Sequence, residues 1–212
     1  MQLRITEIFL SLQGEARDVG RPTVFVRLTG CPLRCHYCDT AYAFSGGLAM
    51  PVDEVLAKVE AYGVRHVTVT GGEPLAQRAV LPLLASLSDA GLAVSLETSG
   101  ALDVSAVDPR VVKVMDLKCP DSGEADRNRL ENLASIGPQD QIKFVIASRN
   151  DYIWSREMMS EHGLAERCEI LFSPVHGRLE PQALAEWILE DRLPVRFQIQ
   201  LHKYLWGEEQ GR

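Results

Sequence analysis

The chain has 212 residues, of which 46% are hydrophobic and 24% are charged, as expected for one globular domain with a sizeable core. The formal net charge of −7 and the absence of a basic stripe argue against a general nucleic-acid binder or an anionic-membrane binder. No apolar run approaches the length of a membrane span, and the first residues lack the apolar core of a signal peptide.

Strand-like and helix-like runs alternate along the chain, and no linker, repeat or low-complexity tract divides them. Segments rich in β-branched residues predict strands over residues 23–29, 66–70, 92–97, 111–117, 141–147, 169–172 and 195–200. Apolar residues at helical spacing, bounded by proline, acidic residues or glycine, predict helices over residues 52–62, 77–90, 126–134, 151–161 and 181–190. Residues 1–20 form a segment that precedes the sheet.

Repeating β-α units predict an α/β fold with a parallel sheet and helices outside it. The number of strands favours a single domain, residues 1–212, built as an incomplete (β/α) barrel of about six parallel strands. In parallel barrels the functional residues follow the carboxyl ends of the strands. Glycine, proline and polar residues cluster after the predicted strands, at residues 30–31, 71–74, 98–100, 118–120, 173–177 and 201–203. We therefore expect the site at this edge of the sheet.

Three of the five cysteines, Cys31, Cys35 and Cys38, form a C-x3-C-x2-C pattern in one short loop. Three thiolates this close can ligate three corners of a cubane iron–sulfur cluster. A structural zinc site or a ferredoxin cluster would recruit a fourth protein ligand, so its absence leaves one iron open for chemistry. The alternative is a zinc knuckle with His36 as fourth ligand, although the usual spacing of compact zinc sites is missing.

An odd number of cysteines, three of them clustered, does not suggest a disulfide framework. We therefore expect a reducing, cytoplasmic location. Cys168 lies at the start of a predicted strand and is expected to act as a small hydrophobic residue.

The cysteine pattern, with Tyr37 directly before its last member, resembles the signature of the radical S-adenosylmethionine (SAM) enzymes. The resemblance implies a 4Fe–4S cluster held by Cys31, Cys35 and Cys38, with SAM chelated on the open iron. It also implies that a 5′-deoxyadenosyl radical abstracts hydrogen from the substrate, and that the fold is a partial (β/α) barrel.

The sequence Thr70-Gly71-Gly72-Glu73-Pro74 resembles the GGE motif of this family, in which Gly72 and Glu73 would receive the SAM ammonium group. Glycine permits close approach of the main chain, and a carboxylate accepts charge-assisted hydrogen bonds. The alternative is a tight strand–helix turn with Glu73 in the first helical turn. Other residues near strand ends or in the cysteine loop are candidates for the SAM pocket, with ordinary loop chemistry as their alternative: Tyr37, Ser99, Lys118, Cys119, Pro120, Ser173, Pro174, Val175 and His176.

Three further segments narrow the resemblance: EIFLSLQGE at residues 7–15, CDT at 38–40 and QLHKYLW at 200–206. Together they make the whole chain similar to the 7-carboxy-7-deazaguanine synthases of queuosine (7-deazapurine) biosynthesis. One departure is Ala16, where many members have glycine. The resemblance implies a lyase that converts 6-carboxy-5,6,7,8-tetrahydropterin to 7-carboxy-7-deazaguanine by radical ring contraction with loss of ammonia. It also suggests a homodimer and a flavodoxin-type reductant.

The same resemblance assigns Thr40 to a magnesium ion, with an N-cap or turn role as the alternative. It assigns to the substrate Leu12, Gln13, Gly14, Glu15, Arg27, Thr70 and His202. Arg27 points from its strand toward the site if Val24, Val26 and Leu28 form the outer packing face. It could then grip the substrate carboxylate with two hydrogen bonds; an ion pair with Glu15 or Glu73 is the alternative. His202, on the last predicted strand, could simply form a surface pair with Lys203.

Two other functions compete with this one. A glycyl-radical-activating enzyme shares the cysteine pattern, but it acts on a partner protein and has no need of a pterin-reading N-terminal segment. A non-catalytic iron–sulfur electron carrier would have no need of the GGE motif. Cleavage of SAM separates the carrier from both enzymes, and pterin-dependent turnover separates the enzymes from each other.

Overall fold

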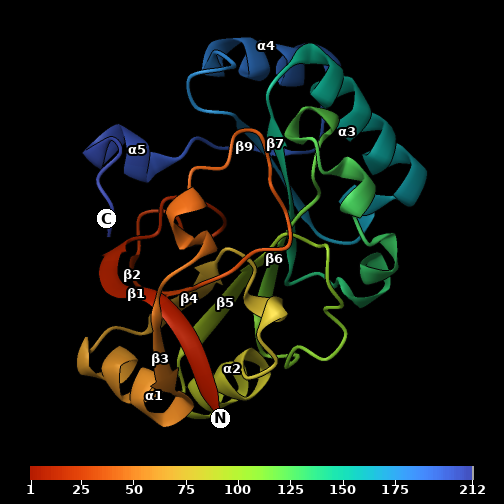
Figure 1. The fold of residues 1–212 in the computed structure, drawn as a ribbon. Coiled ribbons are helices and arrows are strands. Elements are labelled where there is room, and N and C mark those ends of the chain that lie inside the picture. Colours follow the sequence, from red (N-terminus) through yellow and green to blue (C-terminus); the bar gives the residue numbers. More distant parts are fainter. Residues whose placement is uncertain (212) are drawn as a thin grey trace.

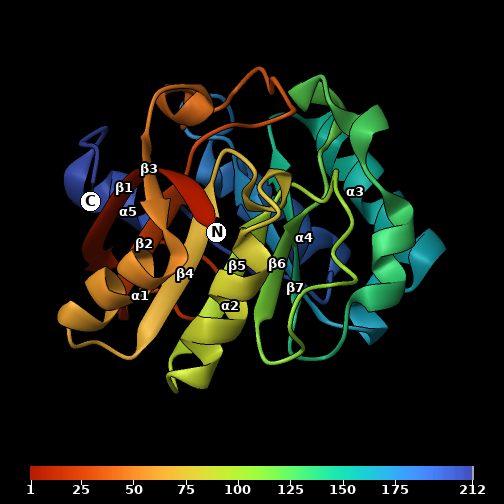
Figure 2. The same ribbon diagram turned by 60° about the horizontal axis from the view of Figure 1, so that its bottom comes forward.

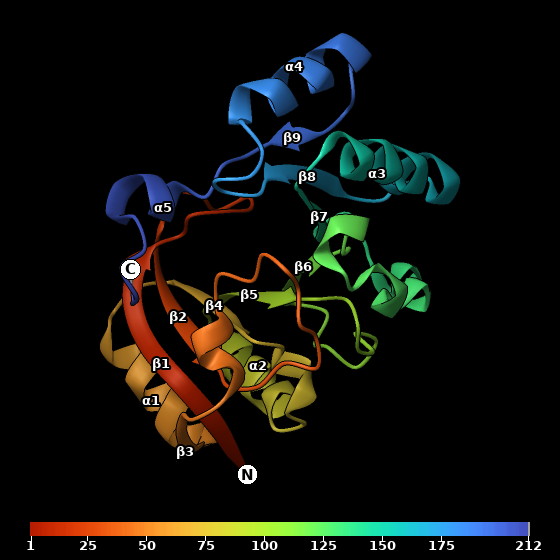
Figure 3. The same ribbon diagram turned by 45° about the horizontal axis from the view of Figure 1, so that its top comes forward.

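One curved sheet of nine strands runs through the structure, a computed structural model that describes residues 1–211 (Figure 1). The strand order is β3-β1-β2-β4-β5-β6-β7-β8-β9, and all pairs from β2 to β9 are parallel. The strands are β1 Gln2–Leu12, β2 Pro22–Leu28, β3 Leu48–Pro51, β4 His66–Gly71, β5 Ala93–Thr98, β6 Val112–Asp116, β7 Gln141–Ile146, β8 Glu169–Pro174 and β9 Arg196–Phe197. They follow one another in an open arc from β1 to β9 (Figure 3). The predicted incomplete barrel is therefore confirmed.

Helices cover the outer face of this arc, with α1 and α2 across one part and α3 and α4 across another (Figure 2). The α-helices are α1 Val52–Ala61, α2 Val80–Asp89, α3 Arg149–His162, α4 Pro181–Asp191 and α5 Leu201–Trp206. Short 3-10 turns are η1 Ala41–Phe44, η2 Pro74–Ala76, η3 Pro120–Ser122, η4 Ala125–Arg127, η5 Leu130–Ser135 and η6 Leu164–Glu166. No helix among residues 1–211 is both long enough and apolar enough to span a membrane.

The strands of the parallel sheet have an apolar outer face and a polar inner face. Successive side chains of a strand point to opposite faces, and Val26 of β2 packs in the main core on the helix side. Its neighbour Arg27 is paired with Thr70 of β4, and farther along the sheet Asp116 of β6 is paired with Lys143 of β7. All four of these polar side chains line the interior cavity. The alternation along each strand thus gives the barrel a charged interior.

Helix α2 begins at Val80, three residues later than predicted. The reason is Pro82, which lacks an amide hydrogen and is accepted only in the first turn of a helix. The predicted helix over residues 126–134 is wrong, because this stretch forms only the short turns η4 and η5. Asn128 in the middle is extended, and its side chain bonds both the amide and the carbonyl of Lys118. Tertiary hydrogen bonds have replaced helical ones here.

The predicted last strand, residues 195–200, is correct only for Arg196 and Phe197. The chain then leaves the sheet, because the amide of Leu201 donates to the carbonyl of Gly14 across the open side of the barrel. His202 and Lys203 therefore lie on α5 and not on a strand, contrary to the prediction.

Strands β1 and β3 have no counterpart among the predicted strands. In β1, Ile5 is paired with Leu28 and Glu7 with Arg27, so β1 advances two residues where β2 advances one. This β-bulge interrupts the alternation of buried and exposed residues that makes a strand recognisable in a sequence. Residues 1–20 were predicted to precede the sheet, but Gln2–Leu12 of this segment form an antiparallel extension of it.

Ala16 has a backbone φ of 63°, in the left-handed region that favours glycine. Its methyl group is buried in a small cluster with Val114 and Leu171 inside the barrel. For Ala16→Gly we expect a stability change below about 1 kcal/mol, because relief of backbone strain offsets the lost methyl contacts. Ala16→Val should cost more than about 2 kcal/mol, since a branched side chain suits neither the φ nor the space. Thermal unfolding of both variants checks this; equal destabilisation would contradict it.

Candidate active site

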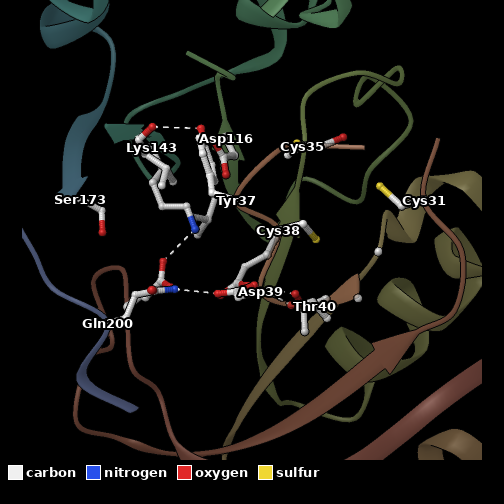
Figure 4. A pocket seen from close by; sticks show the side chains of 18 of the residues that line it. Cys31, Cys35, Tyr37, Cys38, Asp39, Thr40, Asp116, Lys143, Ser173 and Gln200 are labelled. Carbon is white, nitrogen blue, oxygen red and sulfur yellow. Dashed lines mark hydrogen bonds and ion pairs between the residues drawn. The ribbon is translucent and has the colours of Figure 1, made fainter. Parts of the chain in front are cut away.

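A cavity of about 480 Å³ occupies the barrel interior at the carboxyl ends of the parallel strands. The cysteine loop forms one wall, and Lys143, Ser173 and Gln200 lie across from it (Figure 4). The floor comes from the loop after β1, through Gln13 and Glu15. The cavity is thus at the edge where the sequence predicts the site.

The cysteine loop is anchored on both sides by backbone hydrogen bonds. Gly30 donates to the carbonyl of Ala43 and accepts from the amide of Glu73. A Cβ atom on Gly72 would lie 2.2 Å from the Gly30 carbonyl oxygen and 2.8 Å from the Cβ of Cys31. Gly72 is therefore required because the end of β4 passes directly against the loop, a packing reason that applies whether or not SAM also contacts this residue.

Cys31, Cys35 and Cys38 all line the cavity, and none is in a disulfide. Partial burial raises the pKa of all three thiols, that of Cys35 to about 11. Thiolates bind metals as anions, so iron binding would be coupled to loss of these protons. Lys118, close to Cys35, offers positive charge to the anionic form. Three free thiols in one anchored loop on a cavity wall fit a three-cysteine cluster.

The zinc alternative finds no support in this geometry. The ring of His36 lies against the 121–123 turn, with Nδ1 3.3 Å from the carbonyl oxygen of Asp121. Within the described part of the chain, no three His, Cys, Asp or Glu side chains are placed to share one metal ion. A cluster makes no such demand, because each cysteine binds its own iron.

Glu73 is completely buried and does not line the cavity. Its carboxylate accepts hydrogen bonds from the Thr98 hydroxyl at 3.0 Å, and from the Ser99 amide at 2.7 Å and hydroxyl at 2.5 Å. It also caps η2 by accepting from the Leu75 amide. The carboxylate therefore ties β4 to β5 directly behind the cysteine loop, and its predicted SAM contact remains a prediction.

The residues predicted for SAM divide into two groups. Those that line the cavity are Tyr37, Gly72, Ser99, Lys118, Ser173, Val175 and His176. Those that do not are Glu73, Cys119, Pro120 and Pro174. Cys119 is fully buried, and its thiol lies 3.5 Å from the Ser155 hydroxyl beneath α3. Its expected place near the pocket is wrong, since alternation after β6 turns Lys118 inward and its neighbour outward.

The wall that carries Lys118 also contains a carboxylate absent from the sequence prediction. Asp116 accepts an ion pair from the Lys118 ammonium at 2.8 Å through Oδ2. Its Oδ1 is buried and has no hydrogen-bond partner among the described residues. Burial tends to lower the pKa of Lys118, but the negative charges of Asp116 and Cys35 raise it. The net pKa is raised. Asp116 thus holds a protonated Lys118 on the cavity wall.

The floor of the cavity holds a buried ion pair between Lys143 and Glu15, 2.7 Å apart. Burial acts to raise the pKa of Glu15, but the neighbouring ammonium of Lys143 outweighs it, and the net pKa is lowered. The sequence prediction missed Lys143 and Glu97, which also lines the cavity and accepts from the Thr70 hydroxyl. The sequence does carry a signal for both, because each is the single charged residue of its strand.

The N- and C-terminal segments meet over the open side of the barrel. A Cβ on Gly14 would lie 2.3 Å from the ring of His202, so only glycine permits this contact. Gln200 donates from Nε2 to both Glu15 and Asp39, at 3.0 Å each. Four of the residues predicted for the substrate here line the cavity: Leu12, Gln13, Glu15 and His202. Gly14 does not line it and packs against His202.

Thr40 and Asp39 follow the last cysteine on the cavity wall. The Thr40 hydroxyl donates to Asp39 Oδ1 at 2.8 Å, which leaves its oxygen lone pairs available. Thr40 does precede η1, but its side chain makes no capping hydrogen bond. The alternative of an N-cap role is therefore wrong for the side chain.

Arg27 lines the cavity, and Val24, Val26 and Leu28 form the opposite, buried face of β2 as expected. The alternative partners proposed for it, Glu15 and Glu73, are both wrong. Arg27 instead pairs with Glu7, at 2.7 Å. Glu15 pairs with Lys143, and Glu73 accepts hydrogen bonds from Thr98 and Ser99.

Comparison with known proteins agrees with this arrangement. The family model of the radical SAM superfamily matches residues 25–171. The 7-carboxy-7-deazaguanine synthase of Chlorobaculum tepidum is 49% identical over 98% of this chain and 96% of its own length. The enzyme of that name from Koribacter versatilis is 44% identical over 98% of both chains. The crystal structure of QueE from Escherichia coli superposes with a TM-score of 0.80, at 25% identity over 95% of both chains.

Membership of the radical SAM superfamily brings a 4Fe–4S cluster and SAM as its cofactors, and the cysteine wall of the cavity suits both. The chain belongs to the radical SAM superfamily and, within it, to the family of the 7-carboxy-7-deazaguanine synthases.

Proposed function

We propose that the protein converts 6-carboxy-5,6,7,8-tetrahydropterin to 7-carboxy-7-deazaguanine, with loss of ammonia. The observation that carries this is the cavity itself. One continuous space joins the three-cysteine loop to a wall with the cation of Arg27 and a floor rich in amide and carboxylate groups. A flat heterocycle with hydrogen-bonding edges and a carboxylate matches this set of groups.

SAM, when bound at the cluster, supplies the radical that removes a hydrogen from the substrate. The protein's own side chains bind and orient. Arg27 would take the substrate carboxylate, while Gln13, Thr70, His202 and the backbone near Gly14 would read the ring edges. Gln13 is held for this by a hydrogen bond from its Nε2 to the Thr68 hydroxyl at 2.9 Å. Lys118, Ser99, Tyr37 and the segment after β8 would hold SAM.

Magnesium is part of this proposal. The oxygens of Asp39 and Thr40 lie together on the cavity wall, and Gln200 and Lys203 lower the pKa of Asp39 against the raising effect of burial. Mg²⁺ keeps several waters and takes few protein oxygens, with the rest from an anionic substrate. One carboxylate and one hydroxyl beside a site for a carboxylated substrate fit that preference.

Replacing Thr40 by alanine should weaken the stimulation of turnover by magnesium, with a rise of about tenfold in the concentration required. The cluster absorbance should not change, because the cysteine ligands are untouched. Titration of activity with MgCl₂ measures the effect, and Ser45→Ala, in the exposed turn beyond η1, is the control. A magnesium response equal to wild type would remove Thr40 from the metal site.

We also propose the remaining associations that the family suggests: a homodimer, a flavodoxin-type reductant and a cytoplasmic location. The five free cysteines agree with a reducing compartment. Size-exclusion chromatography with light scattering tests the dimer, and reduction of the cluster by a flavodoxin in place of dithionite tests the reductant.

Anaerobic turnover tests the function. The reconstituted enzyme is given dithionite, SAM, magnesium and 6-carboxytetrahydropterin, and products are followed by mass spectrometry. We expect the deazaguanine acid in proportion to the pterin consumed. If 5′-deoxyadenosine forms and the pterin is untouched, another substrate, such as a partner protein, replaces this one. If neither forms on an intact cluster, the electron carrier replaces the enzyme.

A further inference from the structure

The guanidinium of Arg27 is held at one edge and open at the other. Its Nε donates to Glu7 Oε1 at 2.7 Å. Among residues 1–211, neither Nη1 nor Nη2 donates a hydrogen bond to the protein. Arg27 lines the cavity, whereas Glu7 is not among the residues that do and lies behind it, toward the outer surface of β1. The open end of the cation is therefore the end available to a ligand.

The β-bulge in β1 places Glu7 beside Arg27. Before the bulge, Ile5 lies opposite Leu28, and both are buried in the main core. Regular alternation would have put Glu7 on that same apolar face. The extra residue reverses the faces, so that Glu7 and Phe9 lie opposite Arg27 and Phe25. The rings of Phe9 and Phe25 stack at 5.1 Å, in agreement with this register. Bulges often redirect side chains beside functional sites.

Tyr42, in the turn directly after the cysteine loop, completes the arrangement. Its hydroxyl donates to the same Glu7 oxygen at 2.8 Å. The guanidinium carbon of Arg27 lies 5.8 Å from the ring centroids of both Phe9 and Tyr42. Burial raises the pKa of Tyr42 to about 12; Arg27 opposes this effect and Glu7 adds to it. The Tyr42 hydroxyl therefore remains a donor. Two rings and one carboxylate oxygen thus fix the plane and the rotation of the guanidinium.

We propose that Glu7, aided by Tyr42, is a positioning residue that acts through Arg27, holding its Nε edge so that the Nη1–Nη2 end binds the carboxylate of a planar heterocyclic acid. This rests on the proposed function, in which that acid is the carboxylated pterin. A guanidinium whose orientation is set in advance loses less conformational entropy on binding, and a two-pronged contact to a carboxylate requires that orientation. The segment EIFLSLQGE begins with this residue, which does not line the cavity.

Equilibrium binding to the reconstituted enzyme tests the proposal, with two probes measured by anaerobic calorimetry. The probes are 6-carboxy-5,6,7,8-tetrahydropterin and 5,6,7,8-tetrahydropterin, which lacks the carboxylate. Glu7→Ala should weaken the acid about tenfold and the carboxylate-free pterin by less than about twofold. Glu7→Gln should stay within about threefold of wild type for the acid, since its amide oxygen can still accept from Arg27 and Tyr42. Tyr42→Phe should weaken the acid about threefold.

The control is Glu54→Ala, which removes an exposed ion pair with Lys58 on α1 and should change neither constant. Equal weakening of both probes by Glu7→Ala would show a packing role and overturn the proposal, as would no weakening of either. If Glu7→Gln weakened binding of the acid as much as Glu7→Ala, the charge of Glu7 would matter and not its placement of Arg27, and the proposal would be overturned. A wild type that does not bind the acid overturns the proposed function itself, which separates the two failures.

Discussion

Replacing Cys35 by alanine should abolish both cluster assembly and SAM cleavage. A site with three thiolates has no spare ligand, because the protein offers no fourth thiolate and the fourth iron is the one that binds SAM. We expect loss of the cluster absorbance and a fall in 5′-deoxyadenosine formation of more than about 1,000-fold, which corresponds to roughly 4 kcal/mol. Iron content, absorbance near the cluster band and product formation measure this.

The fold should survive this change, since Cys35 lies in a partly exposed loop held by backbone hydrogen bonds. Cys168→Ala is the matched control: it removes a buried thiol far along the chain and should keep the cluster, at a cost of about 1 kcal/mol in stability. Turnover retained by the Cys35 variant would overturn the assignment of the cluster.

Replacing Lys143 by methionine should destabilise the protein by about 3–5 kcal/mol at neutral pH. The change leaves the carboxylate of Glu15 buried without its cation, and both side chains of the pair are only 12–13% exposed. In a chain of this size the expected fall in melting temperature is about 10 °C. Turnover should fall as well, because the same pair forms the floor of the cavity. Lys58→Met, which breaks an exposed pair with Glu54, should cost less than about 0.5 kcal/mol.

The effect of the Lys143 change should depend on pH. In the wild type, burial tends to raise the pKa of Glu15, but Lys143 lowers it below the ordinary value of 4.5. The ionised carboxylate therefore stabilises the fold above that value, and this contribution is lost as the pH falls through the lowered pKa. In the variant, burial prevails and the pKa is raised, so protonation relieves the penalty. The difference in melting temperature should narrow from about pH 7 to about pH 5.5; a constant difference would show that lost packing dominates.

The sequence alone determined the fold class, the cysteine wall and the polar edge of the barrel. Each depends on local order along the chain: β-branched runs alternate with amphipathic ones, three cysteines lie within eight positions, and glycine or polar residues follow the strands. The orientation of Arg27 also followed from alternation within one strand, since its neighbours Val26 and Leu28 are apolar.

The tertiary structure decided which charged groups meet. Lys143 and Glu15 are 128 residues apart and Glu15 and Gln200 are 185 apart, so no local pattern pairs them. The partner of Arg27 was wrong in the sequence prediction because a bulge in β1 reverses the faces of that strand, and a bulge has no reliable signature in residue order.

Element boundaries depended on long-range contacts in the same way. Asn128 breaks a predicted helix by bonding to Lys118, and Leu201 ends a predicted strand by bonding to Gly14. Propensity describes what a segment prefers alone, whereas a hydrogen bond to a distant segment replaces the local one at little cost in free energy. Residue order therefore specified the framework and its chemistry, and three-dimensional proximity specified the partners within the cavity.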